Sequence, residues 1–130
     1  MSQNKSLKGV VVLVVEDDAE TLASVSNLIA NELGCHVLGA LSSAHALAMI
    51  DSGVGVDILL SDVVMPGMDG VGLAKAIREK FPALPIVLAT GWPRAVDLAT
   101  DAGAIPLIKP YSLAQLEAVL TEGLRTKPAA

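Results

Sequence analysis

The chain has 130 residues, of which 52% are hydrophobic and only 2% aromatic, so one aliphatic core is predicted. The net charge is −5, with lysines and arginines scattered singly, which argues against a nucleic-acid-binding surface. The single cysteine, Cys35, excludes an intramolecular disulfide and fits a reducing cytoplasm, and no apolar run suits a secretory signal or a membrane span. We therefore expect a soluble cytoplasmic protein with one domain over residues 9–125 and flexible termini at residues 1–8 and 126–130.

The first predicted elements are a strand and a helix. Val10–Val15 is an unbroken, β-branched apolar run, which is typical of a central parallel strand. The helix that follows is marked by apolar residues at helical spacing: Leu22, Val25, Ile29 and Leu33. Gly34 stands where a helix-ending glycine is expected.

Two more strands and a helix are predicted in the middle of the chain. Cys35–Ala40 is a short strand candidate, and a second helix is marked by Ala44, Leu47 and Ile50. The third strand is the apolar run that leads to Asp62, where the strand should end. Pro66, Gly67 and Gly70 then indicate a loop, with helical periodicity from near Asp69.

The remaining elements follow the same alternation. One helical face is predicted to carry Val71, Ala74, Ile77 and Phe81, with Lys75, Arg78 and Glu79 turned outward. Ile86–Ala89 is the fourth strand, and Pro93–Ala102 is a weaker helix that we expect to be loosely packed. Pro106 suggests that the fifth strand, Ile105–Ile108, lies at an edge. The last helix carries Leu113, Leu116, Leu120 and Leu124, and Ser112 with Gln115 forms a capping box at its start.

Five alternating strand–helix pairs predict an α/β fold with a doubly wound parallel sheet. Right-handed crossovers and one reversal of strand order give a flavodoxin-like (βα)5 sandwich with the strand order 2-1-3-4-5.

Polar side chains occur where the predicted strands end, and the carboxyl ends of parallel strands share one edge of the sheet. These residues are Glu16, Asp17, Asp62, Thr90 and Lys109. Three neighbouring carboxylates favour a hard divalent cation such as Mg²⁺. A metal, an ammonium group and a hydroxyl around one carboxylate suit phosphoryl transfer, because they neutralise the phosphoryl oxygens while a carboxylate oxygen attacks.

The motifs LVVEDD, SDVVMPGMDG, AT and KP occur in this order at successive strand ends. In type and spacing they resemble the receiver domain of bacterial two-component response regulators, including chemotaxis regulators. The resemblance extends from Gly9 to Arg125, and it is specific because all the motifs occur together.

The resemblance implies a role for each matching residue. Asp62 would be the phosphoacceptor, and Mg²⁺ would be held by Glu16, Asp17, Asp62 and the backbone carbonyl of Val64. Thr90 and Lys109 would contact phosphoryl oxygens, and the bond between Lys109 and Pro110 would be cis.

The same resemblance implies a signalling role. Such domains take the phosphoryl group from a histidine kinase or a histidine phosphotransfer protein and then present an altered surface to a downstream protein. The chain would catalyse only its own phosphorylation and dephosphorylation, and would not act as an enzyme on outside substrates. Neither nucleic acid nor membrane is an expected partner, and a homodimer through the fourth helix, fifth strand and fifth helix is compatible with the family. The motifs occur in free-standing receivers and in hybrid kinases, and the sequence leaves this choice open.

Three positions depart from the family pattern or tune it. Pro106 stands where the family often has an aromatic residue that moves on activation. Trp92 and Val64 lie two residues after Thr90 and Asp62, where the family tunes the loss of the phosphoryl group. Apolar side chains at both positions predict slow hydrolysis.

Other interpretations remain open at this stage. The chain could be a pseudo-receiver, an interaction module that does not use phosphate, or a phosphatase with an aspartyl-phosphate intermediate. The phosphatase is disfavoured because it needs a D-x-D pattern after the first strand, and this chain lacks that pattern. Asp18 could cap the first helix, and the Thr90 hydroxyl could bond to nearby backbone. Cys35 is more simply interpreted as a core residue and His36 as a solvent-exposed residue than as a pair of metal ligands.

Overall fold

The computed structural model describes residues 7–64 and 69–125. Residues 1–6 of the predicted flexible segment 1–8 lie outside these ranges, as do the predicted flexible segment 126–130 and the predicted loop residues Pro66 and Gly67. Leu7 is 1% exposed and packs in the core, so the packed structure includes residues before the predicted domain start at Gly9.

Five strands and five helices alternate along the described chain, as predicted. The strands are β1 (Val11–Val15), β2 (His36–Ala40), β3 (Ile58–Asp62), β4 (Ile86–Thr90) and β5 (Ile105–Ile108). The helices are α1 (Ala19–Leu33), α2 (Ser43–Asp51), α3 (Gly70–Lys80), α4 (Ala95–Asp101) and α5 (Leu113–Arg125). None of these helices combines the length and apolar character that crossing a bilayer requires.

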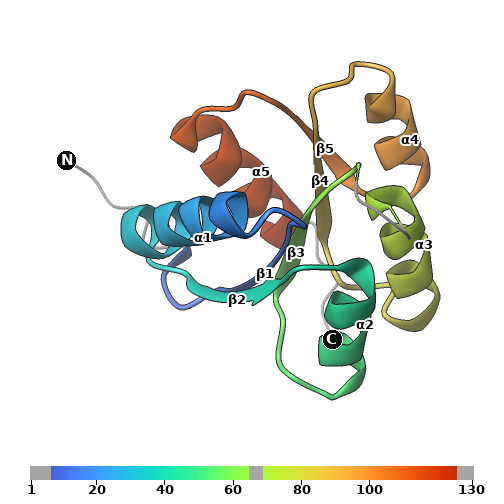
Figure 1. Ribbon diagram of the computed structural model, residues 1–130, viewed down its shortest axis with the longest axis horizontal. Helices are drawn as coiled ribbons and strands as arrows, with labels where there is room; N and C mark the ends of the chain where they lie inside the picture. Colours follow the sequence, from blue (N-terminus) through green and yellow to red (C-terminus); the bar gives the residue numbers. More distant parts are fainter. Residues whose placement is uncertain (1–6, 65–68, 126–130) are drawn as a thin grey trace.

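The strands form one parallel sheet in the order β2-β1-β3-β4-β5, which confirms the predicted flavodoxin-like fold. Helices α1 and α5 cover one face, and α2, α3 and α4 cover the other (Figure 1). Successive side chains of β1 point to opposite faces of the sheet. Val12 and Val14 pack toward α1 and α5, whereas Leu13 and Val15 pack toward the helices on the other face. The strand with the proline, β5, lies at an edge, and among the described strands it pairs only with β4.

Side-chain caps fix where α1, α2, α3 and α5 begin. Asp18 accepts a hydrogen bond from the Thr21 backbone N–H at 3.0 Å, so the capping alternative for Asp18 is confirmed. Asp69 caps α3 in the same way. At the start of α5, Ser112 and Gln115 exchange hydrogen bonds of 3.1 and 2.8 Å, which confirms the predicted capping box.

Several local predictions need correction. Val10 and Cys35 were predicted to begin strands but lie outside β1 and β2, and Gly70 is the first residue of α3 and is not in a loop. In α2, Ala44 is exposed and Ala46 is buried, because the helix is rotated relative to the predicted face. Phe81 lies after α3 and is 38% exposed.

Arg78 does not point outward into solvent. Its guanidinium group donates to the backbone carbonyls of Pro82, Leu84 and Gly103, at 2.7 to 2.8 Å. The loops that follow α3 and α4 supply these acceptors, which helical periodicity cannot indicate.

The helix α4 spans seven residues and lacks a side-chain cap at its N-terminus. Only the small side chains of Ala95 and Ala99 are buried in it, whereas Leu98 is 53% exposed. This agrees with the weak, loosely packed helix that the sequence predicts over Pro93–Ala102.

Candidate functional site

All the predicted site residues lie at the carboxyl edge of the sheet. Glu16 and Asp17 directly follow β1, Asp62 ends β3, Thr90 ends β4 and Lys109 directly follows β5. Because β1, β3, β4 and β5 are consecutive neighbours in the sheet, the fold gathers residues that lie far apart in the sequence.

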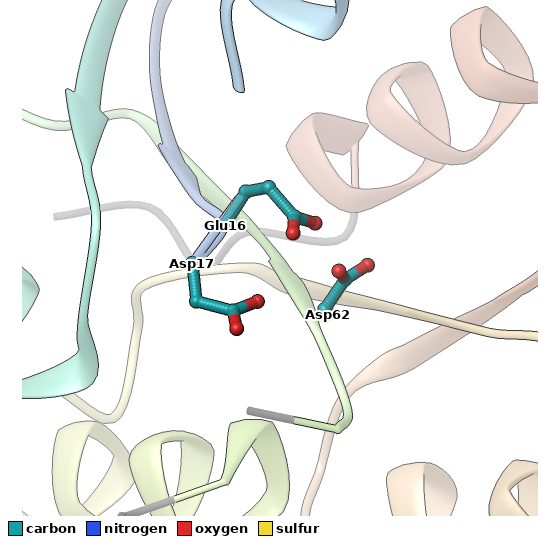
Figure 2. A group of neighbouring side chains, drawn as sticks. All are labelled: Glu16, Asp17 and Asp62. Carbon is teal, nitrogen blue, oxygen red and sulfur yellow. The ribbon is translucent and has the colours of Figure 1, made fainter. Parts of the chain in front are cut away.

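Three carboxylates form an acidic cluster. One oxygen from each of Glu16, Asp17 and Asp62 lies within 4.8 Å of the others. Figure 2 shows Glu16 and Asp17 projecting from the end of β1 toward Asp62 on the neighbouring strand. Glu16 is 7% exposed, whereas Asp17 is on the surface and Asp62 is half-buried. Hard oxygen ligands with one open side suit Mg²⁺, which keeps several of its waters.

The surroundings of Glu16, the buried member of the cluster, disfavour its charged form. Burial, followed by a hydrogen bond with the Asp62 side chain, raises the pKa of Glu16 to about 8. The Asp18 backbone N–H donates to Glu16 Oε1 at 3.1 Å, and this bond acts in the opposite direction. A divalent cation among the three oxygens would favour the charged form of Glu16, so these residues fit such an ion.

Lys109 supplies the positive charge of the site. Its Nζ lies 2.5 Å from Asp62 Oδ1, and its backbone N–H donates to the Thr90 carbonyl at 2.8 Å. The peptide bond between Lys109 and Pro110 is cis, as the resemblance implies. The lysine therefore reaches the central carboxylate from the edge strand.

Thr90 is 4% exposed, and its hydroxyl oxygen accepts a hydrogen bond from the Trp92 backbone N–H at 3.0 Å. The local backbone bond considered for this residue is therefore present. A hydroxyl that accepts one bond still has its hydrogen to donate.

A cavity of about 250 Å³ opens beside Asp62. It is lined by Asp62, Val64, Ala89, Thr90, Gly91, Trp92 and Lys109. Val64 and Trp92 are 59% and 64% exposed, so its rim is apolar while its polar groups come from strand ends. Space of this kind beside a carboxylate and an ammonium group can admit a small anionic group.

Two residues near the site were not predicted. The buried Ser61 hydroxyl donates to the backbone carbonyl of Asp62 at 2.9 Å. Its polarity within an apolar strand was the available signal. Tyr111, just after the cis proline, lines a small pocket with Glu16 and Asp62, and burial raises the pKa of its phenol. No sequence pattern indicated this position.

Comparison with known proteins identifies the family. Residues 12–121 match the family model described as the response regulator receiver domain. The chain belongs to this family. The receiver domain is 37% identical over 103 residues to the response regulator protein FleR of Pseudomonas aeruginosa, covering 77% of this chain and 21% of that protein. It is 36% identical over 118 residues to the sensor kinase CckA of Brucella abortus, covering 88% of this chain and 12% of that protein.

Solved structures share the architecture of this receiver domain. The chemotaxis protein CheY4 of Vibrio cholerae aligns with a TM-score of 0.79 and 29% identity, over 89% of this chain and 99% of that one. A putative response regulator from Chloroflexus aurantiacus aligns with a TM-score of 0.82 and 32% identity, over 91% and 99% of the two chains.

The receiver domain corresponds to only a small part of the first two curated relatives, 21% and 12% of their lengths. Receiver domains are signalling modules that bind Mg²⁺ at an acidic pocket and interact with histidine kinases and downstream effectors. The acidic cluster of Glu16, Asp17 and Asp62 lies where such a pocket is expected.

Proposed function

We propose that this receiver domain accepts a phosphoryl group on Asp62 from a histidine kinase or a histidine phosphotransfer protein. The observation that carries the proposal is the convergence on Asp62 of two further carboxylates, within 4.8 Å, and of the Lys109 ammonium group, at 2.5 Å. A carboxylate crowded by acids and paired with one cation is placed to react once a second cation neutralises its neighbours.

In the proposed reaction, a carboxylate oxygen of Asp62 forms a bond to phosphorus while the bond from phosphorus to the donor imidazole nitrogen breaks. The products are an aspartyl phosphate and a free histidine. Lys109 and the Thr90 hydroxyl would bind phosphoryl oxygens from two strand ends. Mg²⁺ held by Glu16, Asp17, Asp62 and the Val64 carbonyl would supply charge neutralisation.

We further propose that the apolar rim slows the return reaction. Hydrolysis requires water to approach the phosphorus in line, and Val64 and Trp92 border the cavity beside Asp62. Their exposed apolar side chains would leave few polar groups to hold an attacking water.

The output of the proposed switch is a change in protein–protein contacts in the cytoplasm, made by the unit from residue 9 to 125. The pseudo-receiver alternative is not favoured, because each reactive position that the family uses is present and located at the shared edge. Where the family often has a mobile aromatic residue, this chain has Pro106, which lies on β5 opposite Leu88. The proposed change in protein–protein contacts must therefore involve other groups.

The intact mass after incubation with Mg²⁺ and acetyl phosphate tests this proposal. Wild type should gain one phosphoryl group, while Asp62→Asn and a sample with metal chelated should gain none. A folded wild-type protein that gains no phosphoryl group from acetyl phosphate or from a histidine kinase would overturn the proposal.

A further inference from the structure

Gly70, the first residue of α3, is pressed against the peptide that carries the proposed phosphoacceptor. A β-carbon at this position would lie 2.1 Å from the Asp62 carbonyl oxygen, 2.9 Å from the Asp62 carbonyl carbon and 3.0 Å from Val63 Cα. All three neighbours are backbone atoms, which cannot rotate away as a side chain can. Position 70 therefore requires glycine because there is no room for a β-carbon, and not because of an unusual backbone angle.

Gly123 is also tightly packed, but against a side chain and not against backbone atoms. A β-carbon at Gly123 in α5 would lie 2.8 Å from Ile58 Cδ1, the end of a flexible side chain. That contact can relax through an isoleucine rotamer, far from the reactive edge. At Gly70, relief requires movement of the Asp62 backbone or of α3 itself.

Hydrogen bonds hold the same peptide and the Val63–Val64 peptide that follows it. The Val63 N–H donates to the Ala89 carbonyl of β4 at 3.0 Å, and the Val63 carbonyl accepts from the Gly70 N–H at 2.8 Å. The Ser61 hydroxyl donates to the Asp62 carbonyl at 2.9 Å. The Asp62–Val63 peptide is thus fixed between the sheet and the first turn of α3.

We propose that Gly70 is a positioning residue that sets the location of the Asp62 carboxylate and of the adjoining Val64 carbonyl for metal binding and phosphoryl transfer. This inference rests on the proposed function. Relief of the contact requires a shift of about 1 Å, and misplacement on that scale can reduce a reaction about a hundredfold.

The test compares Gly70→Ala with Gly123→Ala, which removes a close-packed glycine of α5 and leaves the site intact. Mg²⁺ affinity is measured by calorimetric titration, the phosphorylation rate by intact mass with acetyl phosphate, and stability by thermal unfolding. We expect Gly70→Ala to weaken Mg²⁺ binding and slow phosphorylation by about tenfold or more. Gly123→Ala should change both by less than about twofold, whatever its loss of stability. Wild-type values in Gly70→Ala, or equal losses in both variants, would overturn the inference.

A measurement on wild type applies even if Gly70→Ala does not fold. When MgCl₂ is titrated, the NMR signal of the Gly70 amide should shift with the same midpoint as that of Asp62. The Phe81 amide, which bonds to the Ile77 carbonyl at the other end of α3, should not shift. A Gly70 amide that ignores Mg²⁺ would overturn the inference. Metal binding by wild type without phosphorylation would instead contradict the proposed function alone.

Discussion

The ion pair between Lys109 and Asp62 joins the edge strand to the centre of the site, over 2.5 Å. We predict that Lys109→Met slows phosphorylation by acetyl phosphate about a hundredfold, because one positioned charge on the phosphoryl oxygens is lost. The time course of mass gain measures the effect. Lys80→Met is the matched control, since Lys80 pairs at 3.4 Å with Asp51 on an exposed surface. A Lys109→Met protein that reacts as fast as this control would contradict the role of Lys109.

The apolar rim gives a second prediction at the residue scale. Trp92→Ala and Val64→Asn should each shorten the lifetime of the aspartyl phosphate several-fold, because each opens the cavity to water. Loss of phosphoryl mass after removal of the donor gives the rate. Leu98→Ala removes another exposed apolar side chain, which does not line the cavity. Unchanged lifetimes in both rim variants would show that the rim does not restrict water.

At the scale of elements, Arg78 connects α3 to the loops that follow α3 and α4. Its guanidinium group provides three charge-assisted hydrogen bonds to the carbonyls of Pro82, Leu84 and Gly103. These bonds join segments that β4 and α4 separate in the sequence.

We predict that Arg78→Met lowers the free energy of unfolding by about 2–3 kcal/mol, because three carbonyls lose their donor. Urea denaturation measures the loss. Lys75→Met, on the exposed face of the same helix, should change the free energy of unfolding by less than about 0.5 kcal/mol. Equal stability of the two variants would mean that solvent replaces the arginine without cost.

At the scale of the whole molecule, the acidic cluster links metal binding to folding. Acidic groups at a common edge oppose the compact state when they are ionised, and a cation that binds only the folded chain stabilises it by mass action. The cluster exists only when β1 and β3 are paired, so the unfolded chain lacks this site.

We therefore predict that Mg²⁺ at about a hundred times its dissociation constant adds about 2.7 kcal/mol to the stability of wild type. Thermal unfolding with Mg²⁺ or with a chelator measures the gain. Asp17→Asn should lose most of it, whereas Asp97→Asn on the exposed side of α4 should keep it. If Mg²⁺ raises the unfolding midpoints of wild type and Asp17→Asn equally, the cluster is not the binding site.

The sequence predicted the strand order and the meeting of five site residues, because apolar runs and strand-end polar residues follow from the parallel-sheet architecture. It did not predict contacts that depend on exact orientation. Helical spacing assigned Arg78 to solvent because it does not include neighbouring loops, and it left Ala46 out of the core face of α2. Gly70 was interpreted as a loop residue, since its close contact with Asp62 appears only when α3 is packed.

The chain has one tryptophan, and the fold places it at the rim of the cavity. The Trp92 backbone N–H bonds to the Thr90 hydroxyl, so a rearrangement of Thr90 changes the surroundings of the indole. All tryptophan emission from this protein therefore originates beside the Asp62 carboxylate. Trp92 is thus an intrinsic fluorescent reporter, and stopped-flow fluorescence can test for the proposed metal binding and phosphoryl transfer without any added label.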